Sequence, residues 1–309
     1  MVQKNNLKPK IIIICGATAS GKTDLAVQVA KLLNSEVVSA DSMYIYKGLN
    51  IGTAKPTIDE MQGVKHHLID VIDAKDKFSV SDYKALAQPI IDNLIRQGKI
   101  PVICGGTGFY INSILYDLSY GNGNENTEIR EKYKELSQKF GNQYVYERLK
   151  EVDLETANKL HFNDLKRVIR ALEIYHNGCK KSDIKDDFVS KYDYFAYSIE
   201  HQRENLYKRI NLRVDKMIEN GLIAEIENLL LNGVNKDCQC MQAIGYKEIL
   251  DYFAGNIDLQ SAIELIKLNS RHYAKRQITF FKKLPNVKQL LPDSAENLAK
   301  IIIKDVKND

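Results

Sequence analysis

Long apolar runs are missing from this 309-residue sequence. No stretch approaches the ~20 consecutive apolar residues of a membrane-spanning helix. The first apolar run, residues 11–15, is too short for the hydrophobic region of a signal peptide. We therefore expect a cytoplasmic protein with no membrane contact.

Cysteine and net charge are also scarce. The five cysteines are scattered, and the pair Cys238 and Cys240 has no second half at the spacing of a zinc site. We expect free thiols, in keeping with a reducing compartment.

The formal net charge is only +4, but residues 265–292 contain seven Lys or Arg and no acid. Such a segment is either a solvated helix face or a nucleic-acid-binding surface.

The apolar runs that are present are short and alternate with helical patterns. This alternation predicts the α/β class, with a parallel β-sheet and crossover helices. The predicted strands are residues 11–15, 36–40, 100–104 and 194–199, with a further short run at 67–72, and the predicted helices of the first part are residues 23–33 and 81–97. From residue 203 onward the chain is expected to be helical, with a late short apolar run at 287–291.

The composition changes near Asp117, where a Gly/Asn-rich loop, residues 118–128, leads into a highly charged and mostly helical stretch. A β-like run follows it, so the sheet is expected to resume. We predict a core domain formed by residues 1–117 and 190–309 and a helical insertion domain formed by residues 118–189. We expect the chain to act as a monomer.

Residues 16–23 match the phosphate-binding motif G-x-x-x-x-G-K-[ST], with a predicted strand before it and a predicted helix after it. In such a loop, backbone N–H groups and the helix N-terminus surround phosphate oxygens, Lys22 adds a positive charge, and Thr23 can ligate Mg²⁺. A loop of this kind most often binds ATP, but its residues do not identify the bearer of the phosphates. The predicted phosphate-binding residues are Gly16, Ala17, Thr18, Ala19, Ser20, Gly21, Lys22 and Thr23.

An ATPase or kinase with this loop usually has a second acid at the end of an apolar strand. The run at 100–104 ends instead in Gly-Gly-Thr-Gly, residues 105–108. The acid that follows an apolar strand is Asp41, which a parallel sheet should place beside the phosphate loop. Asp41 is either a turn residue or a carboxylate that accepts a proton from a nucleophile near the phosphates. The glycines either form a tight turn or let the backbone approach a ligand.

Basic residues gather on three predicted helices. A solvated surface is the ordinary explanation for each of them. Together with a phosphate loop, they favour an anionic polymer as partner, or an arginine lid over phosphates. The three groups are Lys166, Arg167 and Arg170, then Arg209 and Arg213, and finally a stripe of Lys267, Arg271, Lys275 and Lys282.

These motifs together make the sequence similar to the bacterial tRNA dimethylallyltransferase (tRNA isopentenyltransferase) family over nearly the whole chain. The matching motifs occur in order as GATASGKT, DSMYIYKGLNIGTAKPT, HHLID, FSVSDY, PVICGGTGFY, HFNDLKRVIRALE, MQAIGYKEI and YAKRQITFFKK. The resemblance implies a P-loop NTPase-like core with a helical insertion that grips the tRNA anticodon arm. It also implies transfer of a dimethylallyl group from dimethylallyl diphosphate to N6 of the adenosine 3′ of the anticodon, in tRNAs that read codons beginning with U.

The resemblance further implies roles for individual residues. Asp41 would be the general base at N6, while Lys22 and Thr23, with Mg²⁺, would bind the diphosphate and stabilise it as it leaves. Arg209 would assist at the diphosphate, and Thr107 would line the channel where N6 meets the prenyl carbon. The residues implied to contact tRNA are Asp41, Ser42, Met43, Tyr44, Thr107, Arg130, Lys166, Arg167, Val168, Ile169, Arg170, Gln242, Gly245, Lys247, Lys275, Arg276 and Lys282.

Five positions depart from residues common in the family, and they bear on individual tRNA contacts rather than on the reaction. They are Tyr44, Phe162, Lys166, Phe280 and Lys282.

Three alternatives stay open. An isopentenyltransferase acting on free AMP or ADP would need neither the insertion nor the basic C-terminal helix. A small-molecule kinase should carry the second acid, and an RNA-binding protein with a vestigial loop would not need Lys22, Thr23 and Asp41.

Overall fold

The computed structural model describes residues 8–118, 126–185 and 187–308. The chain divides into two compact units, Met1–Leu115 with Ser190–Asp309, and Tyr116–Val189. We call them the core unit and the helical unit. Most of the predicted Gly/Asn-rich loop, residues 119–125, lies outside the described residues.

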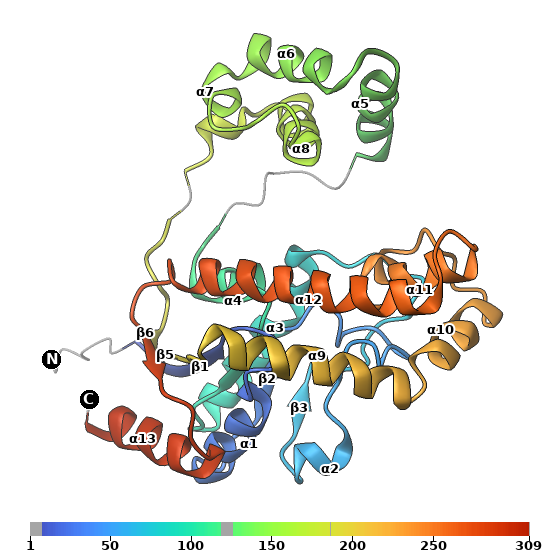
Figure 1. Ribbon diagram of the computed structural model, residues 1–309. Coiled ribbons are helices and arrows are strands. Elements are labelled where there is room, and N and C mark those ends of the chain that lie inside the picture. Colours follow the sequence, from blue (N-terminus) through green and yellow to red (C-terminus); the bar gives the residue numbers. More distant parts are fainter. Residues whose placement is uncertain (1–7, 119–125, 186, 309) are drawn as a thin grey trace, which may run out of the picture. The chain divides into compact units, whose positions relative to one another are not determined.

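A six-stranded parallel sheet forms the centre of the core unit, in the order β3-β2-β4-β1-β5-β6 (Figure 1). The predicted α/β fold with a parallel sheet is confirmed, and each predicted strand has a counterpart. The strands are β1 (Lys10–Cys15), β2 (Val37–Ser39), β3 (His66–His67), β4 (Val102–Gly105), β5 (Asp193–Ile199) and β6 (Val287–Leu290).

The third strand is much shorter than the predicted run of residues 67–72. β3 ends at His67 because the backbone enters the left-handed region at Leu68 (φ 62°) and again at Asp70 (φ 54°). Beyond these turns Ile72 forms only an isolated bridge with Tyr46. The apolar pattern thus marked the region correctly, but the backbone reversals limit the strand to two residues.

Both faces of the sheet are covered by helices. Ile12 and Ile14 of β1 pack in one cluster with α1 (Lys22–Leu32) and α13 (Ala295–Asn308). The intervening Ile11 and Ile13 are equally buried, and successive strand residues point to opposite faces. A strand covered on both sides reads as one continuous apolar run, which explains the pattern of residues 10–15.

The other helices of the core unit lie around this sheet (Figure 1). A small cluster joins Ala17 after β1 to Leu206 and Ile210 of α9 and to Ala274 of α12. No helix among the described residues is long and apolar enough to cross a membrane. The remaining helices are α2 (Ile58–Met61), α3 (Val80–Arg96), α4 (Gly108–Leu115), α9 (Arg203–Glu219), α10 (Leu222–Leu231), α11 (Tyr246–Phe253) and α12 (Leu259–Phe281).

The helical unit has an apolar core of its own. Its helices are amphipathic, and they bury one face each against the others, which is what such a pattern requires. The helices are α5 (Thr127–Phe140), α6 (Asn142–Val152), α7 (Leu154–Ala157) and α8 (Leu165–His176), and the buried residues include Tyr133, Val145, Leu149, Val168, Ile169 and Leu172.

Candidate functional site

The candidate site lies where three adjacent strands, β2, β4 and β1, reach their carboxyl ends. The phosphate loop follows β1, and Asp41 lies two residues after the last residue of β2. The backbone N–H of Ala40 donates to the Cys104 carbonyl (2.7 Å), and that of Thr107 donates to the Ala40 carbonyl (3.0 Å). These bonds hold the segment that carries Asp41 against the glycine-rich turn after β4.

The glycines of that turn allow close approach of protein atoms. A Cβ on Gly105 would lie 2.2 Å from the Ala40 carbonyl oxygen, and one on Gly106 would lie 2.1 Å from Nε2 of Gln277. A Cβ on Gly108 would lie 2.2 Å from the ring of Phe280. The groups that approach these glycines are the β2 end and helix α12, and approach of the backbone to a ligand stays a prediction.

Gln277 is a site residue that the sequence analysis missed. Its Oε1 accepts the backbone N–H of Thr18 (2.8 Å), and its Nε2 donates to the Gly106 carbonyl (3.0 Å). The side chain is only 4% exposed, so both bonds are shielded from water. Helical spacing could have found it, since Gln277 falls on the buried face of α12 between Ala274 and Phe281.

The phosphate loop has the backbone shape that its glycines predict. The φ angle is 128° at Gly16 and 93° at Gly21, both in the region that L side chains rarely adopt. The Lys22 ammonium donates to the Ala17 carbonyl (3.1 Å). Burial lowers the pKa of Lys22, and Arg213 also lowers it, whereas nearby Asp41 raises it. A bound anion would favour the charged ammonium and so offset the burial.

A cavity of about 620 Å³ opens beside this loop. Arg209 donates from Nε to the Ala19 carbonyl (2.7 Å), and Arg213 donates to the Thr18 hydroxyl (3.3 Å). The hydroxyl of Ser20, which also lines the cavity, is buried without a hydrogen-bond partner in the described structure. The cavity is therefore suited to an anion. Its charged lining residues are the cations Lys22, Lys55, Arg209, Arg213 and Lys216 and the acids Asp24 and Glu60.

The donor set fits a magnesium ion bound chiefly through a ligand. Thr23 and Asp24 at the start of α1 supply oxygen atoms at the cavity wall. The described residues contain no group of three or more His, Cys, Asp or Glu side chains able to hold a metal. Mg²⁺ commonly keeps several waters and uses one or two protein oxygens plus substrate phosphates. Thr23 and Asp24 offer protein oxygens of this kind, and phosphate and water would complete the coordination.

Asp41 and Thr107 do not line the cavity but lie close to it. Asp41 Oδ1 accepts the N–H of Met43 (3.0 Å), and Thr107 Oγ1 accepts the N–H of Ser42 (3.0 Å). The other Asp41 oxygen has no hydrogen-bond partner in the described parts of the chain. Burial, with Asp41 as the next contribution, raises the pKa of Tyr273 to about 12, so this phenol of α12 stays a neutral neighbour of the carboxylate.

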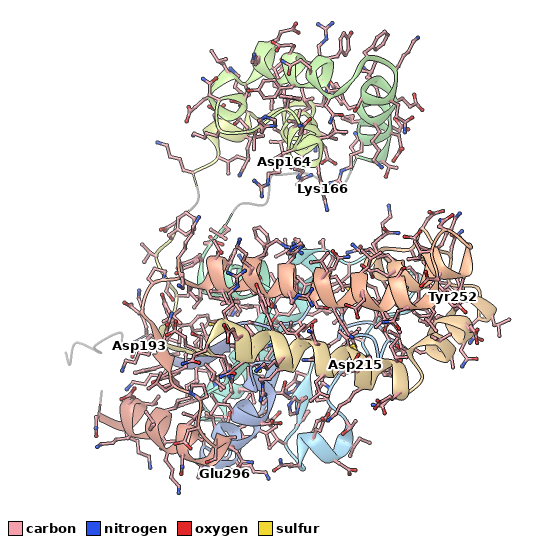
Figure 2. The ribbon with its side chains drawn as sticks, viewed as in Figure 1. Asp164, Lys166, Asp193, Asp215, Tyr252 and Glu296 are labelled. Atoms are coloured by element: carbon pink, nitrogen blue, oxygen red, sulfur yellow. The ribbon has the colours of Figure 1, made fainter. Side chains whose placement is uncertain are left out.

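The basic stripe predicted on α12 is divided in the structure. Lys267 pairs with Asp215 of α9 (2.8 Å), labelled in Figure 2, and Arg271 donates to Asn211 of α9 (2.7 Å). Lys267 and Arg271 of the predicted stripe therefore join α12 to α9. Near the end of the helix Lys275, Arg276, Lys282 and Lys283 are exposed. On neighbouring elements Gln242 and Lys247 are exposed, whereas Gly245 is buried.

The helical unit displays some of its predicted RNA contacts and buries others. Lys166, labelled in Figure 2, and Arg167 are exposed on α8. Val168 and Ile169 are 0% and 5% exposed in the apolar core of the unit. The prediction that these two side chains contact tRNA is therefore wrong, because a five-residue segment of a helix has both an outer and an inner face.

Arg130 and Arg170 share one buried carboxylate. Arg130 donates to both oxygens of Glu173 (3.1 and 3.0 Å), and Arg170 donates to Oε2 (2.6 Å). Glu173 is fully buried, while the two arginine side chains are 30% and 33% exposed. The same carboxylate accepts the N–H of Asn126 at the start of α5. Glu173 is a second residue that the sequence analysis missed.

Comparisons with known proteins bear on the chain as a whole. The family model described as IPP transferase matches residues 44–284. A tRNA dimethylallyltransferase of Thermoanaerobacter sp. (strain X514) is 47% identical, with 96% of each chain covered. One of Clostridioides difficile (strain 630) is 46% identical, with 98% of this chain and 96% of the relative covered.

Solved structures agree with these relatives. The tRNA isopentenylpyrophosphate transferase of Bacillus halodurans superposes with a TM-score of 0.73 at 39% identity, covering 97% of this chain and 98% of that one. A eukaryotic dimethylallyltransferase acting on tRNA gives a TM-score of 0.81 at 28% identity, covering 97% of this chain and 80% of that one.

Proposed function

The chain belongs to the IPP transferase family, and we propose that it transfers a dimethylallyl group from dimethylallyl diphosphate to N6 of the adenosine 3′ of the anticodon, in tRNAs that read codons beginning with U. The names of its relatives support the reaction class and the tRNA substrate. The observation that carries the proposal is the pairing of a cationic phosphate-loop cavity with Asp41, in a sheet whose β4 strand ends without a second acid.

The donor diphosphate would occupy the cavity beside the phosphate loop. Backbone N–H groups of residues 16–23, the Lys22 ammonium and the guanidinium of Arg209 would hold its oxygens. Mg²⁺, held by Thr23 and the diphosphate, would neutralise charge on the leaving group when bound. These groups favour the diphosphate most as its negative charge grows, which lowers the barrier to its departure.

The acceptor adenine would have to leave the base stack to reach this site. N6 would form a bond to C1 of the dimethylallyl group while the bond from C1 to the diphosphate oxygen breaks. The proton lost from N6 would pass to Asp41, whose second carboxylate oxygen is available. Thr107, fixed by its bond to the Ser42 N–H, would line the place where N6 meets C1.

The tRNA would contact both units. Exposed cations of the core unit and of the helical unit would neutralise backbone phosphates, and the segment Ser42 to Tyr44 would lie next to the extruded base. A tRNA substrate also agrees with the cytoplasmic location expected from the sequence, and we propose that the chain acts as a monomer. The proposed surface cations are Lys166, Arg167, Lys247, Lys275, Arg276 and Lys282.

The test is a transfer assay with dimethylallyl diphosphate, Mg²⁺ and three acceptors offered separately: an unmodified tRNA transcript, AMP and ATP. Mass spectrometry should find one dimethylallyl group on the adenosine 3′ of the anticodon, and ATP should not be consumed. A matched transcript with guanosine at that position should stay unmodified. Transfer to AMP but not to tRNA would contradict the proposal, as would ATP turnover without prenyl transfer.

A further inference from the structure

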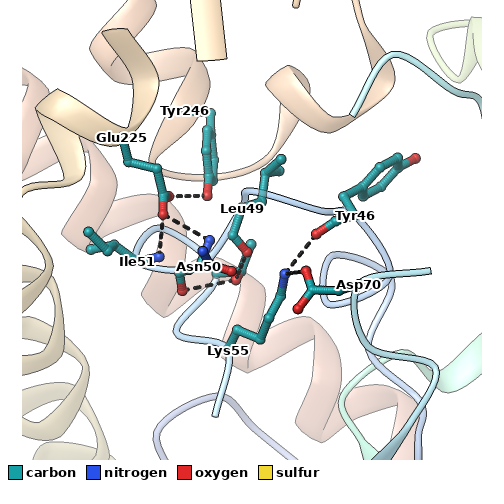
Figure 3. A network of polar contacts seen from close by, with 9 residues as sticks. Tyr46, Leu49, Asn50, Ile51, Lys55, Asp70, Glu225 and Tyr246 are labelled. Carbon is teal, nitrogen blue, oxygen red and sulfur yellow. Dashed lines mark hydrogen bonds and ion pairs between the residues drawn. The ribbon is translucent and has the colours of Figure 1, made fainter. Parts of the chain in front are cut away.

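A turn formed by residues 49–55 makes one wall of the phosphate-loop cavity, which Asn50, Ile51, Ala54 and Lys55 line. We call it the cavity turn. Figure 3 shows it between two groups of polar side chains. Lys55, on one side, donates to the Tyr46 carbonyl (2.7 Å) and pairs with Asp70 (2.5 Å). Glu225 of α10 lies on the other side and does not itself line the cavity.

Glu225 holds the N–H side of the cavity turn. Its carboxylate accepts three consecutive backbone N–H groups, from Asn50 (2.9 Å), Ile51 (2.7 Å) and Gly52 (3.1 Å). Converging N–H groups of this kind form a site for a negative charge. Tyr246, at the start of α11, donates its hydroxyl to the same carboxylate (2.7 Å). Burial and Glu225 both raise the pKa of Tyr246 well above its usual range, so the hydroxyl remains a donor.

The cavity turn has no space to move closer to α10 and α11. A Cβ on Gly52 would lie 2.6 Å from the ring of Tyr246 and 2.8 Å from Leu222. The backbone of the turn therefore rests directly on α10 and α11, and its position is set from outside the cavity.

Arg213 holds the carbonyl side of the same turn. Its Nη2 donates to the carbonyl oxygens of Thr53 (3.4 Å) and Ala54 (3.3 Å), and its Nη1 donates to the hydroxyl of Thr18 in the phosphate loop (3.3 Å). Arg213 lines the cavity, so its guanidinium links the cavity turn to the loop that would hold the donor. A shift of the two carbonyl groups would move this guanidinium.

We propose that Glu225 is a positioning residue for diphosphate binding, acting through the cavity turn on Arg213. It fixes three N–H groups of the turn, the turn fixes two carbonyl groups, and these orient the guanidinium toward the cavity. The inference rests on the proposed function in one respect, that the cavity binds the diphosphate of the donor.

The test is a double-mutant cycle on binding of inorganic diphosphate with Mg²⁺, measured by titration calorimetry on the full chain. Losing an arginine contact to phosphate should weaken binding about 10- to 100-fold in Arg213→Gln. Glu225→Gln should weaken it about fivefold, and it should have less than a twofold effect when Arg213 is already Gln, since effects that share one route do not add. Glu227→Gln, an exposed acid on the same helix, is the matched control and should bind like the wild type.

Wild-type affinity in Glu225→Gln would overturn the inference, and so would losses that multiply in the double variant. If Glu225→Gln does not fold, Tyr246→Phe replaces it. That variant removes one hydrogen bond to the carboxylate. On its own it should bind diphosphate about twofold more weakly than the wild type, and combined with Arg213→Gln it should bind no more weakly than Arg213→Gln alone. Failure of wild-type protein to prenylate tRNA while it binds diphosphate would contradict the proposed function alone.

Discussion

Two groups of cations, one in each unit, are held in different ways. In the core unit Lys22, Arg209 and Arg213 donate to backbone carbonyl oxygens, and none of them lies within ion-pair distance of a carboxylate in the described residues. In the helical unit Arg130 and Arg170 share the buried carboxylate of Glu173. Carbonyl partners fix a cation without neutralising it, whereas a shared carboxylate holds two cations together and offsets part of their charge.

The difference matches the two ligands that we propose. A diphosphate carries several charges in a small volume and must become more stable as it leaves, which calls for cations with undiminished charge. An RNA backbone spreads its charges out and must be released after the reaction, and partly exposed arginines held in one place suit such a contact. The core unit is thus expected to decide the chemistry, while the helical unit contributes only to tRNA affinity, together with the exposed cations of the core unit.

The largest difference between the effect on transfer rate and the effect on tRNA affinity should come from Asp41→Asn. Loss of a general base costs about 10²- to 10⁴-fold in rate, so kcat for transfer should fall by that factor while tRNA affinity stays within twofold. Single-turnover prenylation and a filter-binding titration measure the two quantities. Near wild-type rate in this variant would remove Asp41 from the mechanism.

A smaller effect, confined to the helical unit, should follow Glu173→Gln. The change leaves two partly exposed arginines without their buried partner, and we expect α5 and α8 to lose about 2 kcal/mol of protection. Hydrogen exchange with mass spectrometry measures this helix by helix. Glu128→Gln, an exposed acid at the start of α5, is the control and should have no effect.

The loss in Glu173→Gln should depend on pH. Burial alone would raise the pKa of Glu173, but hydrogen bonds from Arg170 and Arg130 outweigh it and hold this pKa below the usual 4.5. A carboxyl group with a lowered folded-state pKa stabilises above its unfolded value, and that contribution is lost as pH falls through the folded value. The difference between wild type and variant should therefore be full at pH 7 and shrink below about pH 4. An equal difference at pH 3 would mean that the ion pairs contribute nothing.

About a tenfold rise in the KM for dimethylallyl diphosphate is expected for Gln277→Leu. The change unpairs the Thr18 N–H and the Gly106 carbonyl, each a cost of about 1 kcal/mol, and it loosens the phosphate loop. Because Gln277 is buried although it belongs to the helix that carries Lys275 and Arg276, the KM for tRNA should not change. Steady-state kinetics with each substrate varied in turn test this, with the exposed Gln260→Leu of the same helix as control. A rise in the tRNA KM instead would place Gln277 at the RNA surface.

The smallest effect should come from Arg167→Gln. The Arg167 side chain is 73% exposed and pairs with Asp164 at the surface (3.3 Å), so stability should change by less than about 0.5 kcal/mol. Affinity for tRNA should fall about threefold, and the slope of log affinity against log salt should become shallower by about one. An unchanged slope would show that Arg167 contacts no phosphate.

Much of the core unit followed from local patterns. The phosphate loop, each strand region and Asp41 at a strand end could be predicted because a strand, a tight turn and a helix each leave a signal in neighbouring residues. The β3 strand was overestimated because left-handed backbone at Leu68 and Asp70 leaves no such signal when the residue is not glycine.

The residues that were missed join segments far apart in sequence. Gln277 bonds to Thr18, and Glu225 bonds to Asn50. The only local sign of Gln277 is its place on the buried face of α12, and nothing near Glu225 in the sequence distinguishes it from an ordinary polar side chain of a helix. Val168 and Ile169 were predicted as RNA contacts for a different reason. The whole segment Lys166–Arg170 was matched to the family motif, although only the outer face of this helix is exposed.

Steady-state kinetics of two single variants, one from each unit, test the central claim most directly. Arg213→Gln removes a carbonyl-held cation of the cavity, and Lys166→Gln removes an exposed cation of α8. We predict that the first raises the KM for dimethylallyl diphosphate about tenfold or more with the KM for tRNA unchanged, and that the second raises only the KM for tRNA, about threefold. If both variants raised the KM of the same substrate, the division of labour between the two units would be contradicted.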